Sequence, residues 1–206
     1  MGFYENHILP RVLDFAMKRS SLDEQREWIM KRVRGEVLEM GFGSGLNLPF
    51  YPQQVRTLTA VEPNAGMRDR AEKRIKASGR TVSLIARPME KKQMLAEGSF
   101  ETIVSTWSLC TIADPAAALR EVYRLLRPGG RFLFVEHGLS PDPDVAAWQH
   151  RLSGITRKWG GGCNLDRDIA KIVLASGLEI EPLEKFNLTS GLRVGAYTYR
   201  GVGIKA

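Results

Sequence analysis

The chain has 206 residues, enough for one domain with a full hydrophobic core. Its 43% hydrophobic and 26% charged residues are typical of soluble globular proteins, and no apolar run reaches the roughly 18 residues that a membrane-spanning helix needs. The formal net charge of +7 comes from 30 basic and 23 acidic residues spread along the chain. We therefore expect a solvated surface and no nucleic-acid partner.

The amino-terminal residues and the cysteines indicate the compartment. Glu5, His7 and Pro10 fall within the first ten residues, where a signal peptide would be apolar, so a cytoplasmic location is expected. Cys110 and Cys163 are far apart and form no CxxC pair, which argues against a disulfide framework and agrees with a reducing compartment. The three histidines are scattered, and no metal site is predicted from these spacings.

Two helices are predicted in residues 1–34, and the second is expected to begin at Ser21 with Glu24 in the capping-box position. Short apolar runs rich in Val, Ile, Leu and Phe follow. They are nearly continuous rather than alternating, as in a parallel sheet covered on both faces. The strands predicted from them are residues 36–40, 58–61, 82–86, 102–106 and 131–135.

Helices are predicted between these strands because their ends carry start and stop signals. Asn64 is placed to cap a helix over 65–78, which Gly79 ends. Asp114 and the proline after it open a helix over 116–127, which the Pro-Gly-Gly of 128–130 ends. Strand–helix–strand units of this length imply right-handed crossovers and a doubly wound sheet.

The pattern changes after the fifth strand. A loop (138–144), helical segments (145–156 and 166–175) and two late strands (178–186 and 194–204) are predicted, the strands as an antiparallel edge. The predicted fold is α/β, with a doubly wound, mostly parallel, seven-stranded, Rossmann-like sheet. One domain is expected over 1–206, with a helical cap (1–34), a cofactor-binding core (35–138) and a substrate-side part (139–206).

Three glycines, two residues apart, follow the first predicted strand in the segment VLEMGFGSGLN of 37–47. Without side chains, Gly41, Gly43 and Gly45 let the backbone turn sharply and approach a ligand closely. A dinucleotide fingerprint needs glycine where Leu46 stands, and a phosphate-binding P-loop needs a following Lys-Ser or Lys-Thr that this segment lacks. The loop therefore favours a ligand of nucleoside size over NAD, FAD or a nucleotide phosphate.

An acidic residue ends the second predicted strand. Glu62 follows Gly41 by about 20 residues, the spacing at which a carboxylate binds both ribose hydroxyls in this topology. Taken alone, Glu62 reads as a solvated loop carboxylate. Combined with the glycine loop, it predicts an adenosine site.

The series VLEMGFGSG, AVEPN, SFETIVSTWSLCTI and LRPGGRFLFVEHG resembles the class I S-adenosylmethionine-dependent methyltransferases over roughly residues 35–138. More narrowly, REWIMKRVRGEVLEMGFGSGLNLPFYP, STWSLC, WQHRL and GGCNLDRD resemble the mammalian alkyl thiol methyltransferase family and its bacterial relatives. These mammalian proteins carry a leading hydrophobic anchor that this sequence does not show, so at most peripheral membrane contact is expected.

The resemblance implies S-adenosylmethionine as cofactor, S-adenosylhomocysteine as product, and no metal. It places residues of the first motif at the methionyl end: Glu39, Gly41, Gly43, Gly45 and Asn47. It assigns Glu62 to the ribose and Met67 to the adenosine. Ser105, Thr106 and Trp107 are expected on the methionyl side and at the substrate entrance. Ordinary packing is the alternative for Met67 and Trp107.

The adenine end departs from the family pattern. The segment RPME at 87–90 has a proline near the position where the family has an acidic residue. We expect Met89 to contact adenine through its backbone, with Glu90 as a second candidate. Simple packing is the alternative for Met89.

Residues for the methyl acceptor are predicted outside the core motifs. His137, at the end of the fifth strand, is the candidate base by position and pKa, with structural hydrogen bonding as the alternative. Tyr4 and His7 are expected to close over the pocket with the apolar face of the first helix, residues 8, 9, 12 and 15. Candidates for acceptor contacts in a flexible flap are Trp148, Cys163 and Asn164, and helix packing, a glycine hinge and an N-cap at Asn164 form the alternative.

Three functions remain open from the sequence. The first is methyl transfer to a small-molecule acceptor, an apolar thiol. The second is N-methylation of a phospholipid headgroup or another amine. The third is S-adenosylmethionine binding without catalysis. The identity of the acceptor and the oligomeric state are not readable from the residues.

Overall fold

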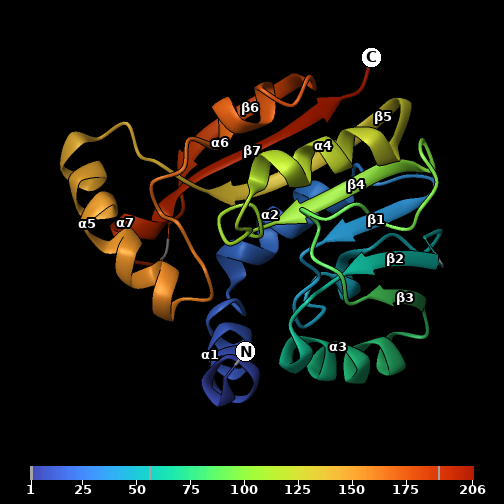
Figure 1. Cartoon of the computed structure of the whole chain (residues 1–206), viewed down its shortest axis with the longest axis horizontal. Helices are drawn as coiled ribbons and strands as arrows, with labels where there is room; N and C mark the ends of the chain where they lie inside the picture. Colours follow the sequence, from blue (N-terminus) through green and yellow to red (C-terminus); the bar gives the residue numbers. More distant parts are fainter. Residues whose placement is uncertain (1, 56, 190) are drawn as a thin grey trace.

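The computed structural model describes residues 2–55, 57–189 and 191–206. Over these ranges seven strands form one sheet in the order β3-β2-β1-β4-β5-β7-β6 (Figure 1). The strands are β1 (Val37–Met40), β2 (Thr57–Val61), β3 (Thr81–Ile85), β4 (Phe100–Thr106), β5 (Leu126–His137), β6 (Glu179–Asn187) and β7 (Tyr197–Ile204). The helices are η1 (Tyr4–Ile8), α1 (Leu9–Ala16), α2 (Ser20–Met30), η2 (Leu48–Phe50), α3 (Ala65–Ser78), α4 (Pro115–Leu125), α5 (Pro143–Trp159), α6 (Ile169–Leu174) and α7 (Arg193–Ala196).

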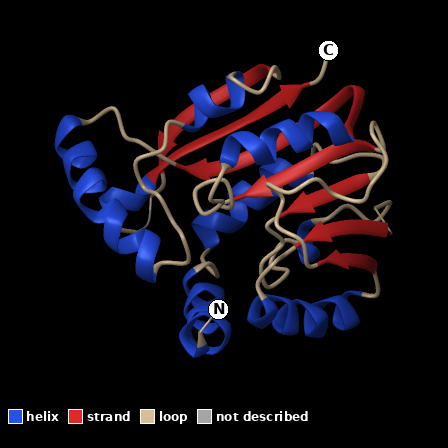
Figure 2. Ribbon diagram, viewed as in Figure 1, coloured by secondary structure: helices blue, strands red, loops and turns tan. Residues whose placement is uncertain are grey.

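The central parallel strands β1 and β4 and the residues Phe132–Val135 of β5 are buried on both faces, whereas the edge strand β3 is partly exposed. Along β5, Phe132 and Phe134 pack in one cluster with Leu119 of α4, whereas Leu133 and Val135 belong to the cluster that contains residues of α2. Helices therefore cover both faces, as Figure 2 shows. This is why the strands read as continuous apolar runs rather than as alternating ones.

The two late strands form the predicted antiparallel edge. Strand β7 pairs antiparallel with both β5 and β6, so that His137 lies opposite Thr198 and β6 forms the outer edge. The strand β7 begins at Tyr197, later than predicted, because residues 193–196 form the short helix α7. No helix in the described ranges is both long enough and apolar enough to cross a membrane.

The predicted bounds of the helix over 65–78 and the predicted caps at Asn64 and Asp114 are confirmed, whereas the helices predicted over 145–156 and 166–175 run over Pro143–Trp159 and Ile169–Leu174. The side chain of Asn64 accepts a hydrogen bond from the N–H of Met67, and that of Asp114 accepts one from Ala117, so both residues are N-caps. Gly79 ends α3 in the left-handed conformation. The helix α4 ends at Leu125, earlier than predicted, because the Pro-Gly-Gly segment belongs to β5.

Two predicted caps are wrong. The helix α2 begins at Ser20 after an extended Arg19 and has no side-chain cap, so Ser21 lies inside the first turn and is not a capping-box residue. The cap of α6 is Asp168, not Asn164. The side chain of Asn164 instead donates to the carbonyl oxygens of Cys110 and Gly162, which need a partner in the loop.

Candidate active site

A cavity of about 410 Å³, within the range of small-molecule sites, opens at the carboxyl edge of the parallel strands. Its walls come from the loops after β1, β2 and β4 and from the end of β5, where ligands bind in a doubly wound sheet. Helix α1 and the carboxyl end of α5 close the other sides. The predicted residues that line it are Glu39, Gly41, Gly43, Asn47, Glu62, Met67, Thr106, Trp107, His137 and Cys163.

The glycine loop and Glu62 are joined by hydrogen bonds. The N–H groups of Gly43 and Asn64 each donate to one carboxylate oxygen of Glu62 at 2.8 Å. Burial raises the pKa of Glu62, and these two bonds oppose the rise. A Cβ at Gly43 would meet only the carbonyl of Gly41, at 3.9 Å, so the turn is open to the cavity. Each Glu62 oxygen keeps a lone pair for a ribose hydroxyl, and the residues fit a nucleoside.

Glu39 supports the glycine loop through buried hydrogen bonds. It is 1% exposed, and its two oxygens accept hydrogen bonds from Asn47 and from the Tyr51 hydroxyl, each at 2.7 Å. Burial raises the pKa of Glu39 to about 7, although both bonds lower it. Asn47 also donates to the hydroxyl of Thr106 at 2.9 Å. Glu39 therefore fixes the loop through Asn47 and Tyr51.

Arg26 of α2 is a lining residue that sequence reasoning missed. It is 3% exposed and donates to the side chain of Asn47 at 3.1 Å, and its guanidinium lies 5.2 Å from the ring centroid of Trp107. A cation thus lies beside the glycine loop, at the end predicted for the methionyl group. The sequence feature that could have revealed Arg26 is its helical spacing from Leu22 and Ile29, which places it on the same buried face of the helix.

Asp14 joins helix α1 to the rest of the site and was also missed. Its carboxylate accepts from the Ser44 hydroxyl at 2.5 Å and forms ion pairs with Arg74 at 2.7 Å and with Arg70 and Lys18 at 3.1 Å. Burial acts to raise the pKa of Asp14, but the hydrogen bonds from Ser44, Arg70 and Lys18 outweigh it and hold the pKa well below its usual range. These contacts hold α1 against the glycine loop and α3.

Two unusual features lie near the end of β4: the strained backbone of Trp107 and the buried carboxyl group of Glu136. Trp107 has a φ of 50°, rare for a residue with a side chain, and its N–H donates to Val135 at 2.8 Å. Strain of this kind gathers at functional sites. Ser105 does not line the cavity; its hydroxyl donates to the buried Glu136 at 2.7 Å. Burial raises the pKa of Glu136, whose Oε2 has no hydrogen-bond partner among the described residues.

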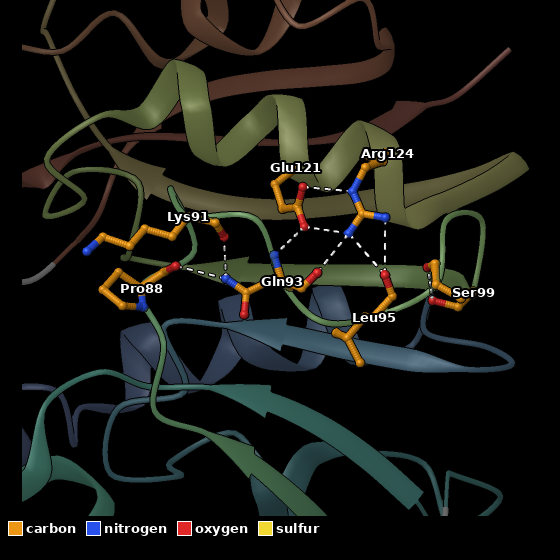
Figure 3. Close-up of polar contacts among 8 residues, drawn as sticks. Pro88, Lys91, Gln93, Leu95, Ser99, Glu121 and Arg124 are labelled. Carbon is orange, nitrogen blue, oxygen red and sulfur yellow. Dashed lines mark hydrogen bonds and ion pairs between the residues drawn. The ribbon is translucent and has the colours of Figure 1, made fainter.

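The residues predicted at the adenine end lie away from the cavity walls. The side chain of Met89 is 2% exposed and packs in the core, and neither it nor Glu90 lines the cavity. Figure 3 shows how the loop after β3 is held: Glu121 of α4 accepts from the N–H of Gln93 at 2.7 Å, while the Gln93 amide donates to Pro88 at 2.8 Å. The adenine contact through the backbone of Met89 stays a prediction.

Three side chains far apart in the sequence meet at the other end of the cavity. The sulfurs of Cys110 and Cys163 and the Nε2 atom of His137 all lie within 4.8 Å of one another, with 2.9 Å between Nε2 and the Cys163 sulfur. The hydrogen bond from Cys110 and the one from His137 lower the pKa of Cys163 to about 5 against the effect of burial. Burial acts to lower the pKa of His137, but Cys163 reverses this and raises it.

None of the remaining acceptor candidates lines the main cavity. Tyr4 donates its hydroxyl to the carbonyl of Trp159 at 2.8 Å, whereas His7 lines a separate small hollow against α3. Trp148 is 53% exposed and lines no part of the main cavity. Asn164 joins the loop of Gly162 to the loop of Cys110 by donating to the carbonyl oxygens of both residues.

The first helix meets the cavity with only part of the predicted face. Leu9 lines the cavity as predicted, together with Leu13, whereas Ile8, Val12 and Phe15 are 42%, 54% and 83% exposed. The ion pairs of Asp14 set this rotation of the helix, because Asp14 must point at the glycine loop. Gly45, the third glycine of the loop, packs against Leu48 and Phe42 rather than lining the cavity.

Comparison with known proteins agrees with this geometry. A protein-family model described as a methyltransferase domain matches residues 38–134. The solved structure of the YcgJ protein from Bacillus subtilis superposes with a TM-score of 0.68 at 17% identity, covering 89% of this chain and 98% of that one. The fold, the glycine loop and Glu62 are those expected of a class I S-adenosylmethionine-dependent methyltransferase, and residues 38–134 are similar to the methyltransferase domain family.

Among proteins of known activity, the chain is similar to thiol S-methyltransferases. It is 35% identical over 139 residues to thiol S-methyltransferase TMT1B of Homo sapiens, which is 66% of this chain and 56% of that protein. It is 33% identical over 164 residues to thiol S-methyltransferase TMT1A of Homo sapiens, 74% of this chain and 64% of that one. The chain thus spans about three-fifths of the length of these relatives.

Proposed function

We propose that the chain transfers the methyl group of S-adenosylmethionine to a small apolar thiol. The observation that carries the proposal is one continuous cavity with two chemically different ends. Glu62 follows β2 and lies beside the glycine loop, whereas His137 ends β5, three places from β2 in the strand order, with Cys163 next to it. The similarity to thiol S-methyltransferases supports a thiol as the acceptor.

Different lining residues bind the ribose, the sulfonium tail and the carboxylate of the cofactor. The ribose hydroxyls donate to Glu62, and the sulfonium tail crosses the side-chain-free turn at Gly41 and Gly43. The methionyl carboxylate faces Arg26, whose guanidinium has N–H groups left after its bonds to Asn47, Asp23 and Met17. This orientation directs the sulfonium methyl toward the end of the cavity that holds His137 and Cys163.

Methyl transfer from a sulfonium needs little from the protein besides alignment. The acceptor sulfur attacks the methyl carbon opposite the departing sulfur, and holding the two in line contributes up to roughly 7–11 kcal/mol. A thiol with a pKa of about 8.5 is already partly ionised to the thiolate at neutral pH, so a general base is optional. The role of His137 as that base stays a prediction, because its Nε2 atom faces Cys163.

An apolar acceptor agrees with the cavity walls, because Leu9, Leu13 and Met17 line the cavity. Small-molecule sites are lined mainly by apolar side chains with a few polar groups. The cytoplasmic location and the peripheral membrane contact stay predictions.

The test is to incubate the protein with methyl-labelled S-adenosylmethionine and an alkyl thiol, an alkyl amine or phosphatidylethanolamine, with the Glu62→Ala variant as the inactive control. Label is expected in the thiol with the parent protein and not with the variant. Label in the amine or the lipid instead would show an N-methyltransferase. Bound cofactor without label in any acceptor would show a binding protein.

A further inference from the structure

The cluster of Cys110, His137 and Cys163 has the composition of a metal site. Cys110 follows β4, His137 ends β5 and Cys163 lies in the loop after α5, and each offers one ligand atom within 4.8 Å of the other two. All three residues line the cavity, at the end opposite Glu62. The group therefore faces the space in which the acceptor must lie.

The two cysteine loops are fixed against each other by their backbones. The N–H and the side-chain amide of Asn164 both donate to the carbonyl of Cys110, at 2.8 and 3.0 Å, and Thr156 donates to the carbonyl of Cys163 at 2.8 Å. Gly162 has a φ of 89°, and a Cβ there would lie 2.9 Å from the Thr111 carbonyl. Such support holds ligands in place before an ion binds.

The distances suit zinc. In a tetrahedral site, Zn–S bonds near 2.3 Å and Zn–N bonds near 2.0–2.1 Å separate the ligand atoms by about 3.6–3.8 Å. The three atoms here lie within 4.8 Å, and the contact between His137 and Cys163, now 2.9 Å, has to lengthen by about 0.7 Å. Two thiolates and a neutral imidazole balance the charge of Zn²⁺. The charged neighbours of Cys110 are Glu136 and Arg167, whose opposite charges offset each other.

We propose that Cys110, His137 and Cys163 bind one zinc ion, whose fourth position faces the cavity and takes the acceptor thiol as a thiolate. Three protein ligands with one open position are the arrangement of catalytic rather than structural zinc. The acceptor part of this inference rests on the proposed function, whereas the metal site itself does not. His137 is then a ligand and not the base.

The reaction balances without a further co-reactant. The acceptor loses its S–H proton to water as its sulfur binds zinc, because metal coordination deprotonates a thiol. A lone pair of that sulfur forms the new bond to the methyl carbon. The bond from this carbon to the sulfonium breaks, and its electron pair stays on the sulfur of S-adenosylhomocysteine. The product thioether is neutral, a weaker ligand than the thiolate, and water replaces it.

The experiment measures metal content rather than activity. The reduced full chain is equilibrated with zinc buffered by a competing chelator, and bound zinc is counted per chain. We expect one zinc in the parent and in His150→Ala, whose imidazole pairs with Asp166 outside the cavity. We expect loss of zinc in Cys163→Ser and in His137→Ala. Binding of S-adenosylmethionine by these variants verifies that they are folded.

Cobalt supplies a second, direct readout. Co²⁺ bound by the parent is expected to show thiolate-to-metal absorption, which changes when an alkyl thiol is added and is weaker in Cys163→Ser. A parent that retains no zinc against the chelator, or a Cys163→Ser variant that retains as much as the parent, overturns the proposal.

Failure of this inference is distinguishable from failure of the proposed function. If the zinc-free protein methylates the thiol at the full rate, thiol methylation stands and the proposed role of zinc in acceptor binding is overturned. If zinc binds through the three ligands and no thiol is methylated, the metal site is supported and its role in acceptor binding is overturned.

Discussion

The backbone N–H of Gly43 donates a 2.8 Å hydrogen bond to the carboxylate of Glu62, 19 residues later in the chain. This bond joins the turn after β1 to the end of β2 and aims the acid at the open side of the glycine loop. The ribose site is therefore made by two adjacent strands, and each half depends on the other.

Replacing Glu62 by alanine should weaken the binding of S-adenosylmethionine at least about tenfold, because hydrogen bonds to a charged group contribute about 1.5–3 kcal/mol each. Isothermal titration calorimetry measures this directly. Glu72→Ala, on the exposed side of α3, is the matched control and should bind as the parent does. Unchanged affinity in Glu62→Ala would remove the ribose assignment.

Arg26→Gln should reduce the affinity for S-adenosylmethionine about tenfold or more, because the variant lacks the charge that faces the methionyl carboxylate. Loss of the contact with Asn47 also affects binding, so the decisive quantity is a ratio. The parent should bind S-adenosylmethionine more tightly than its decarboxylated analogue, and the variant should bind both alike.

Lys31→Gln, at the exposed carboxyl end of the same helix, serves as the control for Arg26. It should keep the parent ratio of the two affinities. A variant of Arg26 that still prefers the carboxylated ligand by the parent factor would place the carboxylate elsewhere.

Glu39 should make stability depend on pH. Burial raises its pKa in the folded state to about 7, above the ordinary value of about 4.3, so the folded protein binds this proton more tightly than the unfolded chain. Its stabilising contribution is complete below about pH 4 and is lost as the pH rises to about 7. Glu39→Gln cannot ionise and should gain about 2–3 kcal/mol over the parent between about pH 5 and pH 8.

Urea unfolding of both proteins at the two pH values checks this. Glu72→Gln should show no such change, since its side chain is exposed in both states. A difference between Glu39→Gln and the parent that is the same at both pH values would mean that Glu39 stays ionised in the folded protein.

Sequence patterns were sufficient to predict the alternation of strands and helices, the caps at Asn64 and Asp114, the glycine loop and the position of Glu62. The helix caps depend on neighbours within a few residues, so they can be predicted locally. The glycine loop and Glu62 follow strand ends, which parallel pairing brings to one edge of the sheet. The cavity-facing side of the first helix was predicted correctly at Leu9 and wrongly at Ile8, Val12 and Phe15, because apolar spacing alone does not show which rotation the ion pairs of Asp14 enforce.

Which distant residues meet could not be predicted from the sequence and is seen in the folded chain. Asp14 and Arg26 approach the glycine loop because two amino-terminal helices pack against the sheet edge, and no local spacing encodes that approach. Cys110, His137 and Cys163 come from three separate loops and have no metal-ligand spacing in the sequence. Their meeting follows from the order of strands in the sheet, which sets contacts across the chain rather than along it.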